Sequence, residues 1–252
     1  MYSVHLSSGS GKGEPVTEQS EAARRPLNTE RVLRAAVALA DATGIDSLSM
    51  RRLAQELGVV PMALYKHVAN KEELLDGMAD VVVGEIDPPD PDVDWKSAVR
   101  QRILSARQAL LRHPWASRVI ESRTRPTPAT LAYLDSMIGM FRAGGLSVDL
   151  THHVMHALGS RVLGFSQELF DDGAPGPDPG TQAAALREMS RRYPHIAEVA
   201  SRADHDGRSV VGPGCDDQFE FEFALDLLLD GFDRLRRQGW SSATGQRSHH
   251  RS

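Results

Sequence analysis

Three histidines in the second half of the chain have a spacing that metal binding uses. His152 and His156 are four residues apart, which places their imidazoles on one face of a helix, as in half of a zinc site. Glu168 follows twelve residues after His156 on the same predicted helix, and a rise of ~1.5 Å per residue separates the two by roughly 18 Å. A complete site would need ligands from another helix or subunit. A helical metal-dependent enzyme using His152, His153 and His156 is therefore one alternative function.

Other patterns that enzymes require are missing from the sequence. No GxSxG nucleophile elbow, glycine-rich phosphate loop or HExxH motif occurs. The acid pairs Asp171–Asp172 and Asp216–Asp217 flank loop breaks, where acids serve as helix caps or solubilising charges. Cys215 is the only cysteine, so one chain can form neither a disulfide nor a thiolate metal cluster. We expect no catalytic residues, no resident metal and no cofactor.

A group of cations in the first third of the chain offers binding chemistry instead. The formal net charge of the whole chain is -5, so any basic surface must be local. Between residues 47 and 71 the only anion is Glu56, and it stands against four cations, Arg51, Arg52, Lys66 and Lys71. The stretch that follows is acidic. This local positive charge indicates a nucleic-acid backbone as the partner.

The cations lie in a segment whose pattern predicts a helix, a tight turn and a second helix. Ser49 is placed to cap the first helix, and Gly58 supplies the permissive backbone that ends it. The apolar positions between them recur at helical spacing, at Leu53, Ala54 and Leu57.

The second helix of the segment presents a small, basic face. Pro61 can begin this helix without losing a hydrogen-bond donor, and Leu64 and Val68 form its buried stripe. The opposite face carries Met62, Ala63, Lys66 and His67. A rigidly held helix with such a face has the shape and charge to enter a DNA major groove.

Two further helices complete this unit. A bracing helix capped by Asn28 or Thr29 ends at Thr43–Gly44, and a connecting helix starts at a capping box of Asn70 and Glu73 and runs to about residue 86. We therefore predict a helix-turn-helix DNA-binding domain over residues 27–86. Residues 1–26 read as a flexible arm whose terminal arginines either contact DNA or remain solvated.

A proline- and aspartate-rich run at residues 87–94 predicts a linker, and amphipathic helices follow it. The pattern predicts helices at residues 95–112, 114–120, 127–143 and 147–170, a weaker pair between 181 and 203, and a last helix at 216–237 before a flexible tail at 238–252. The fold class is all-α. No signal peptide or 18-residue apolar stretch occurs, so we expect a cytoplasmic protein with no membrane contact.

Two of these helices are more apolar than a surface helix requires. The helix at 216–237 contains FEFEFALDLLLDGF, and the helix at 147–170 combines small residues with large apolar ones. We expect both to form a homodimer interface with a two-fold four-helix arrangement.

From Leu39 to Asp76, through LSMRRLAQELGV, LYKHV and NKEELLD, the chain resembles the tetracycline-repressor (TetR) family of bacterial regulators. The resemblance continues at residues 112–115, 124–127, 144–147, 163–165 and 229–232, which look like the C-terminal domain of the tetracycline-repressor subgroup. It implies an all-helical homodimer, with a C-terminal ligand-binding and dimerisation domain over 95–237. It also implies a palindromic operator in double-stranded DNA and a small-molecule inducer.

Carried over by position, the resemblance implies DNA contacts from the start of the second helix, from the recognition helix and from the next helix. Arg51, Tyr65, His67 and Lys71 can hold phosphates, whereas Lys66 can reach guanine acceptors. The full set is Ser49, Met50, Arg51, Pro61, Met62, Ala63, Tyr65, Lys66, His67 and Lys71.

The subgroup's magnesium-tetracycline site matches at one acidic position only, Glu168. Asp87, Arg102 and Ala106 stand where a histidine, an asparagine and a phenylalanine would be expected, and Ser160 stands where another histidine would be. A metal-chelated tetracycline is therefore not the expected inducer, although the location of the pocket should persist.

Residues that could line this pocket are mainly large apolar, aromatic or histidine side chains. They are Arg102, Trp115, Met137, Met140, Phe141, His152, Met155, His156, Phe165 and Glu168. Such walls suit a bulky apolar ligand with few polar groups, and Arg102 could neutralise an acid.

The leading prediction is a ligand-responsive transcriptional regulator that acts as a repressor and is released from a palindromic operator when a small molecule binds the C-terminal domain. A DNA-binding protein without a ligand, which would have a filled C-terminal core, and the metal-dependent enzyme are the alternatives. The sequence leaves repression and activation both open.

Overall fold

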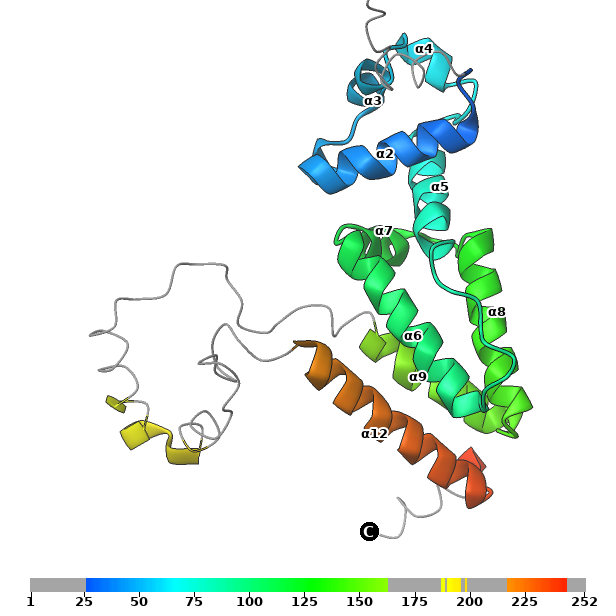
Figure 1. The fold of residues 1–252 in the computed structure, drawn as a ribbon, viewed down its shortest axis with the longest axis vertical. Helices are drawn as coiled ribbons and strands as arrows, with labels where there is room; N and C mark the ends of the chain where they lie inside the picture. The colour runs from blue at the N-terminus through cyan, green and yellow to red at the C-terminus, as the bar shows by residue number, and fades with distance from the viewer. Residues whose placement is uncertain (1–25, 163–186, 189, 196–197, 199–216, 244–252) are drawn as a thin grey trace, which may run out of the picture. The chain divides into compact units, whose positions relative to one another are not determined.

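The computed structural model describes residues 26–162, 187–188, 190–195, 198 and 217–243, and all the regular secondary structure in these ranges is helical (Figure 1). The predicted all-α class is confirmed. The chain forms two compact units that divide between Val81 and Val82, inside helix α5 (Lys71–Val83) and ahead of the boundary expected at residue 86. No helix in the described ranges is long and apolar enough to cross a bilayer.

The first unit contains α2 (Thr29–Thr43), the short 3-10 helix η1 (Ile45–Ser47), α3 (Met50–Glu56), α4 (Pro61–Leu64) and most of α5. Asn28, rather than Thr29, caps α2, since its side chain accepts a hydrogen bond from the Arg31 N–H at 2.8 Å. One face of α2 is apolar and packs inward. The buried side chains of this unit include Val32, Ala36, Val37, Ala40, Leu53, Leu64, Val68, Leu74 and Met78.

Helix α5 starts at the predicted cap. Asn70 Oδ1 accepts a hydrogen bond from the Glu73 N–H at 2.8 Å, and Glu73 Oε2 accepts one from the Ala69 N–H at 2.6 Å. The expected reciprocal bond was to the N–H of Asn70 itself, so the acid reaches one residue farther back. The helix ends at Val83, and two backbone turns continue the chain to Ile86.

The second unit is built from α6 (Trp95–Arg112), α7 (Ala116–Ser122), α8 (Pro128–Ala143), α9 (Val148–Val162) and α12 (Asp217–Arg237). Asp94 caps α6 and Thr127 caps α8, each by accepting hydrogen bonds from backbone N–H groups of the first turn. The FEFEF segment belongs to one continuous helix, as predicted. The expected helix beyond Val162 and much of the expected pair between 181 and 203 lie outside the described residues.

The core of the second unit lies between four helices. Helix α6 packs on α8 and α12, and α9 packs on the same two helices. Opposite charges line the contact of α6 with α12: Arg100 Nε lies 2.7 Å from Asp226 Oδ1 and Arg100 Nη2 lies 2.6 Å from Glu222 Oε2. The apolar core beneath includes Val99, Ile103, Met137, Phe141, Leu146, Val154, Leu225 and Leu229.

Candidate DNA-binding face and ligand cavity

A compact turn joins α3 to α4. Gly58 adopts a positive φ of 67°, which an L side chain rarely adopts, and the Gly58 N–H donates to the Gln55 carbonyl at 3.2 Å. The Val59 N–H donates to the Ala54 carbonyl at 2.9 Å, which completes a Schellman motif. At the other end of α3, Ser49 Oγ accepts from the Arg52 N–H at 3.2 Å. Local hydrogen bonds therefore fix both ends of α3, as the sequence predicted.

The recognition helix is shorter than expected. Helix α4 ends at Leu64, and the segment from Tyr65 to His67 forms turns in which the N–H groups of His67 and Val68 both donate to the Leu64 carbonyl. The prediction of a helix through Val68 is therefore wrong after Leu64. No side chain caps the start of α4, and its last predicted turn holds residues of low helix propensity. Leu64 and Val68 nevertheless are buried, as expected.

The side chains proposed to contact DNA all remain accessible. Met62 is 71% exposed and Tyr65 45% exposed. The others divide into exposed residues, Ser49, Arg51, Pro61, Lys66 and Lys71, and half-buried ones, Met50, Ala63 and His67. Because α3 packs on α4 and the Thr29 hydroxyl donates to the His67 carbonyl at 3.5 Å, this face rests on a fixed scaffold. Val60, 68% exposed beside Pro61, is a neighbouring apolar position that the sequence reasoning missed.

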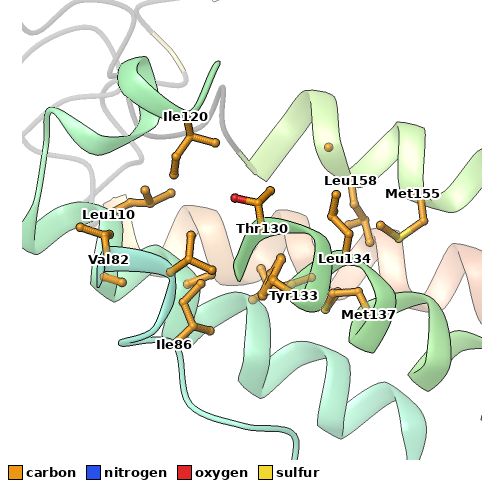
Figure 2. A pocket seen from close by; sticks show the side chains of 15 residues that line it. Val82, Ile86, Leu110, Ile120, Thr130, Tyr133, Leu134, Met137, Met155 and Leu158 are labelled. Carbon is orange, nitrogen blue, oxygen red and sulfur yellow. The ribbon is translucent and has the colours of Figure 1, made fainter. Parts of the chain in front are cut away.

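The second unit holds a cavity of about 170 Å³ (Figure 2). Its walls come from the end of α5 and the turn after it, from α6 and α7, and from α8 and α9. The lining residues are Val82, Val83, Ile86, Ile103, Ala106, Ala109, Leu110, Ile120, Thr130, Tyr133, Leu134, Met137, Met155, Leu158 and Gly159. The side chains drawn in Figure 2 are almost entirely carbon, with the Thr130 hydroxyl oxygen as the visible polar atom. The cavity is therefore suited to apolar molecules.

Of the residues expected to line the pocket, Met137 and Met155 line this cavity. Phe141 and Trp115 are buried elsewhere, Phe141 in the core beneath and Trp115 against the ring of His113. Met140 is half-buried and packs against the core. His152 and His156 are exposed on α9, and Phe165 and Glu168 lie outside the described residues.

Arg102 lies beside the cavity and is not part of its lining. Its guanidinium carbon is 5.0 Å from the centre of the Tyr133 ring, and its Nη1 donates to the Asp87 carbonyl. Burial raises the pKa of Tyr133 to about 12, although the Arg102 charge lowers it, so the phenol is protonated at neutral pH. Tyr133 and Thr130 are not among the pocket residues expected from the sequence. The spacing of Thr130, Tyr133, Leu134 and Met137 on one face of α8 was the available signal.

The three histidines of α9 are close together but do not form a metal site. The ring centres of His152 and His156 are 4.6 Å apart, and His153 Nε2 lies 3.6 Å from Asp149 Oδ1. Within the described part of the chain, no group of three or more His, Cys, Asp or Glu side chains could hold a metal ion.

Comparison with known proteins adds an independent finding. Residues 32–78 match the family described as bacterial regulatory proteins, tetR family, and residues 87–236 match the tetracyclin repressor-like C-terminal domain. The HTH-type transcriptional repressor DrrR1 of Streptomyces coeruleorubidus is 31% identical over 230 residues, which cover 86% of this chain and 82% of that protein.

Two solved structures are similar over most of the chain. ActR of Streptomyces coelicolor in complex with (S)-DNPA has a TM-score of 0.64 at 27% identity, covering 82% of this chain and 98% of that chain. BioQ with its double-stranded DNA operator has a TM-score of 0.55 at 27% identity, with the same coverage of 82% and 98%. One of these similar structures thus contains a small molecule and the other contains DNA.

Proposed function

Because the chain belongs to the TetR family of ligand-responsive transcriptional repressors, we propose that it binds a palindromic operator as a homodimer and leaves it when a small molecule enters the cavity. Regulators of this family are DNA-binding transcription factors and not enzymes. The alternative of a metal-dependent enzyme using His152, His153 and His156 has no support.

The observation that carries the DNA-binding proposal is the accessible face on α3 and α4. Met62 of α4 and Lys66 of the turn after it are exposed there, and the Schellman motif at Gly58 fixes how α3 leads into α4. Lys66 can donate to guanine in a major groove, and Met62 can contact thymine methyl groups. Arg51 and Lys71 are exposed cations suited to phosphate contacts that position the face.

The homodimer proposal is supported by an apolar stripe on α12. Phe219, Phe223 and Leu227 recur every four residues and are 55%, 54% and 59% exposed in the single chain. The rings of Phe219 and Phe223 are stacked with their centres 6.4 Å apart. An exposed apolar stripe on a helix whose opposite face is packed in the core is typical of a subunit interface. We propose that α12 and α9, with the residues that follow α9 to about 170, pair with the same helices of a second copy.

The cavity supports the proposal that a ligand controls DNA binding. A protein that binds DNA without a ligand was expected to have a filled core in its C-terminal domain. Val82 and Val83, the last residues of α5, form part of the cavity wall, and Leu74 and Met78 of the same helix are in the core of the first unit. A ligand that displaces this wall acts on the helix that leads to the DNA-binding unit. By linkage, such a ligand binds the DNA-free conformation more tightly, and DNA weakens ligand binding by the same factor.

The proposal can be tested by selecting genomic DNA fragments with the purified full-length protein and sequencing them. We expect an enriched palindrome, and we expect the affinity for it to fall steeply as salt rises because phosphate contacts release counterions. Fragments without a shared palindrome, or a salt-independent affinity, would contradict the proposed function.

A further inference from the structure

The described residues that line the cavity carry no charge. None of the fifteen residues that line it is acidic or basic, and apart from the Thr130 and Tyr133 hydroxyls and the two methionine sulfurs their side chains are hydrocarbon or hydrogen. An ionised group that entered would lose its hydration without gaining an opposite charge.

The Arg102 guanidinium has its contacts outside the cavity lining. Arg102 packs its guanidinium on the ring of Tyr133, which lines the cavity, and donates to the Asp87 carbonyl, whereas Arg102 itself is not among the lining residues. Arg102 Nε is buried without a hydrogen-bond partner among the described residues, which makes it the group that would favour an acid if the side chain turned inward.

The Thr130 hydroxyl can donate one hydrogen bond into the cavity if it accepts one from the Thr127 hydroxyl. The Thr130 N–H donates to Thr127 Oγ1 at 3.3 Å, and the two hydroxyl oxygens are 2.9 Å apart. Because Thr127 is buried and its oxygen already accepts from the backbone, the Thr127 hydroxyl can donate to Thr130 Oγ1. The Thr130 O–H then remains available for an acceptor on a ligand, and Figure 2 draws its oxygen among the carbon side chains of the wall.

The size of the cavity limits the ligand in the conformation described. An engineered apolar cavity of about 150 Å³ is known to hold benzene, and this cavity has about 170 Å³. The cavity is therefore of a size suited to a one-ring molecule with small substituents.

We propose that this cavity selects uncharged, largely apolar ring compounds that present one carbonyl-type acceptor to Thr130, and that it rejects ionised acids. The inference deepens the proposed function, since it names the ligand class of the same site. It also replaces the sequence-based expectation that Arg102 neutralises an acidic ligand.

The test uses two probes of matched shape, 4-methylacetophenone and 4-methylbenzoate, titrated into the full-length protein and followed by protein-observed NMR. We expect the ketone to bind at least about tenfold more tightly than the carboxylate, which has no counter-charge in the cavity. Thr130→Val keeps the shape of the side chain and should weaken ketone binding about two- to tenfold, the range for one lost hydrogen bond. Leu131→Ala, on the exposed side of the same helix, is the matched control and should leave the affinity unchanged.

Binding of 4-methylbenzoate that is as tight as ketone binding, or tighter, would overturn the inference. If Arg102→Gln then abolished 4-methylbenzoate binding, Arg102 would be the counter-charge of the carboxylate. Ketone binding that Thr130→Val leaves unchanged would overturn the role of Thr130, provided that thermal unfolding shows both variants folded. Failure of both probes to bind would overturn the cavity's assignment while leaving the operator selection intact. Conversely, ketone binding without an enriched operator would contradict the proposed function and leave this inference standing.

Discussion

Trp95 at the start of α6 lies directly against Gly144 at the end of α8, so closely that a Cβ on Gly144 would be 2.3 Å from Trp95 Cγ. The Trp95 ring also packs on Phe141 with the ring centres 6.0 Å apart. Gly144 has a φ of -70° and a ψ of -2°, values open to any residue, so its requirement for glycine is one of space and not of backbone conformation.

Gly144→Ala should therefore destabilise the protein. The added methyl group forces Trp95 away from its position in the core, and overpacking of this kind costs about 1–3 kcal/mol. Gly139→Ala is the matched control, because its Cβ would meet nothing within 4 Å and it lies inside α8, where alanine is favoured by up to about 1 kcal/mol. Urea unfolding of the two variants should show opposite signs, and equal stabilities would refute the steric account.

The Glu85 carboxylate gives a pH-dependent contribution to stability. Its Oε2 lies 2.8 Å from Arg112 Nη2 and 3.2 Å from His113 Nε2. Burial raises the pKa of Glu85, but hydrogen bonds from Arg112 and His113 outweigh burial and hold it below the ordinary value. A carboxylate with a lowered pKa stabilises the folded state above its unfolded pKa of about 4.3, and this contribution is lost as the pH falls through the folded value.

Glu85→Gln should lower the free energy of unfolding at pH 7 and flatten its decline below about pH 4.3. The comparison is urea unfolding at pH 7 and at successively lower pH, with Glu121→Gln, at an exposed position on α7, as the control. If Glu85→Gln and the wild type had the same free energy of unfolding at pH 7 and at the lowest pH, the contacts of Glu85 with Arg112 and His113 would contribute nothing to stability.

A charge placed in the exposed apolar stripe of α12 should prevent the homodimer from forming. Phe223→Asp places a carboxylate on the face that we assign to the interface with the second copy. It also removes the contribution that burying one large apolar side chain makes to association, about 1.5–3 kcal/mol. Sedimentation should show monomers for this variant and reduced operator affinity. Leu131→Asp makes the same change at a position of similar exposure on α8, 53% against 54% for Phe223, and should remain dimeric. Dimers in both variants would exclude α12 from the interface.

Lys66 predicts how base specificity is distributed. Met62 and Ala63 of α4 offer no hydrogen-bonding side chain, so we expect Lys66, in the turn after α4, to supply the group that reaches base edges, and DNA shape to supply the rest. Lys66→Ala should weaken operator binding by about 1–3 kcal/mol and relax the sequence preference in a binding selection. Arg52→Ala removes a cation that we do not assign to DNA and serves as the control. An equal loss on all sequences would make Lys66 a phosphate contact.

The parts of the molecule governed by local rules were predictable from the sequence. Ser49, Gly58 and Pro61 fix the ends of α3 and the start of α4 through caps and backbone conformation, which depend on a few neighbouring residues. The length of α4 was overestimated because no side chain caps its start and because turns, in which the Leu64 carbonyl accepts from His67 and Val68, lead directly to the cap that starts α5 at Asn70.

The cavity could not be predicted in detail, because its lining depends on which faces of distant helices meet. Tyr133 enters the wall since α8 packs on α6, and the end of α5 joins it through Val82. Phe141 has the same apolar character as Met137 but lies in the core, four residues farther along α8. Composition alone does not distinguish these two positions.

The central claim, that two copies read two half-sites together, is tested most directly by changing the spacing of the selected operator. Half-sites in successive major grooves are about 34 Å apart, so inserting five base pairs, about half a helical turn, moves them to opposite faces of the duplex. We predict that fluorescence anisotropy will show the affinity falling to that of a duplex with one half-site. An unchanged affinity for the lengthened operator would contradict the account.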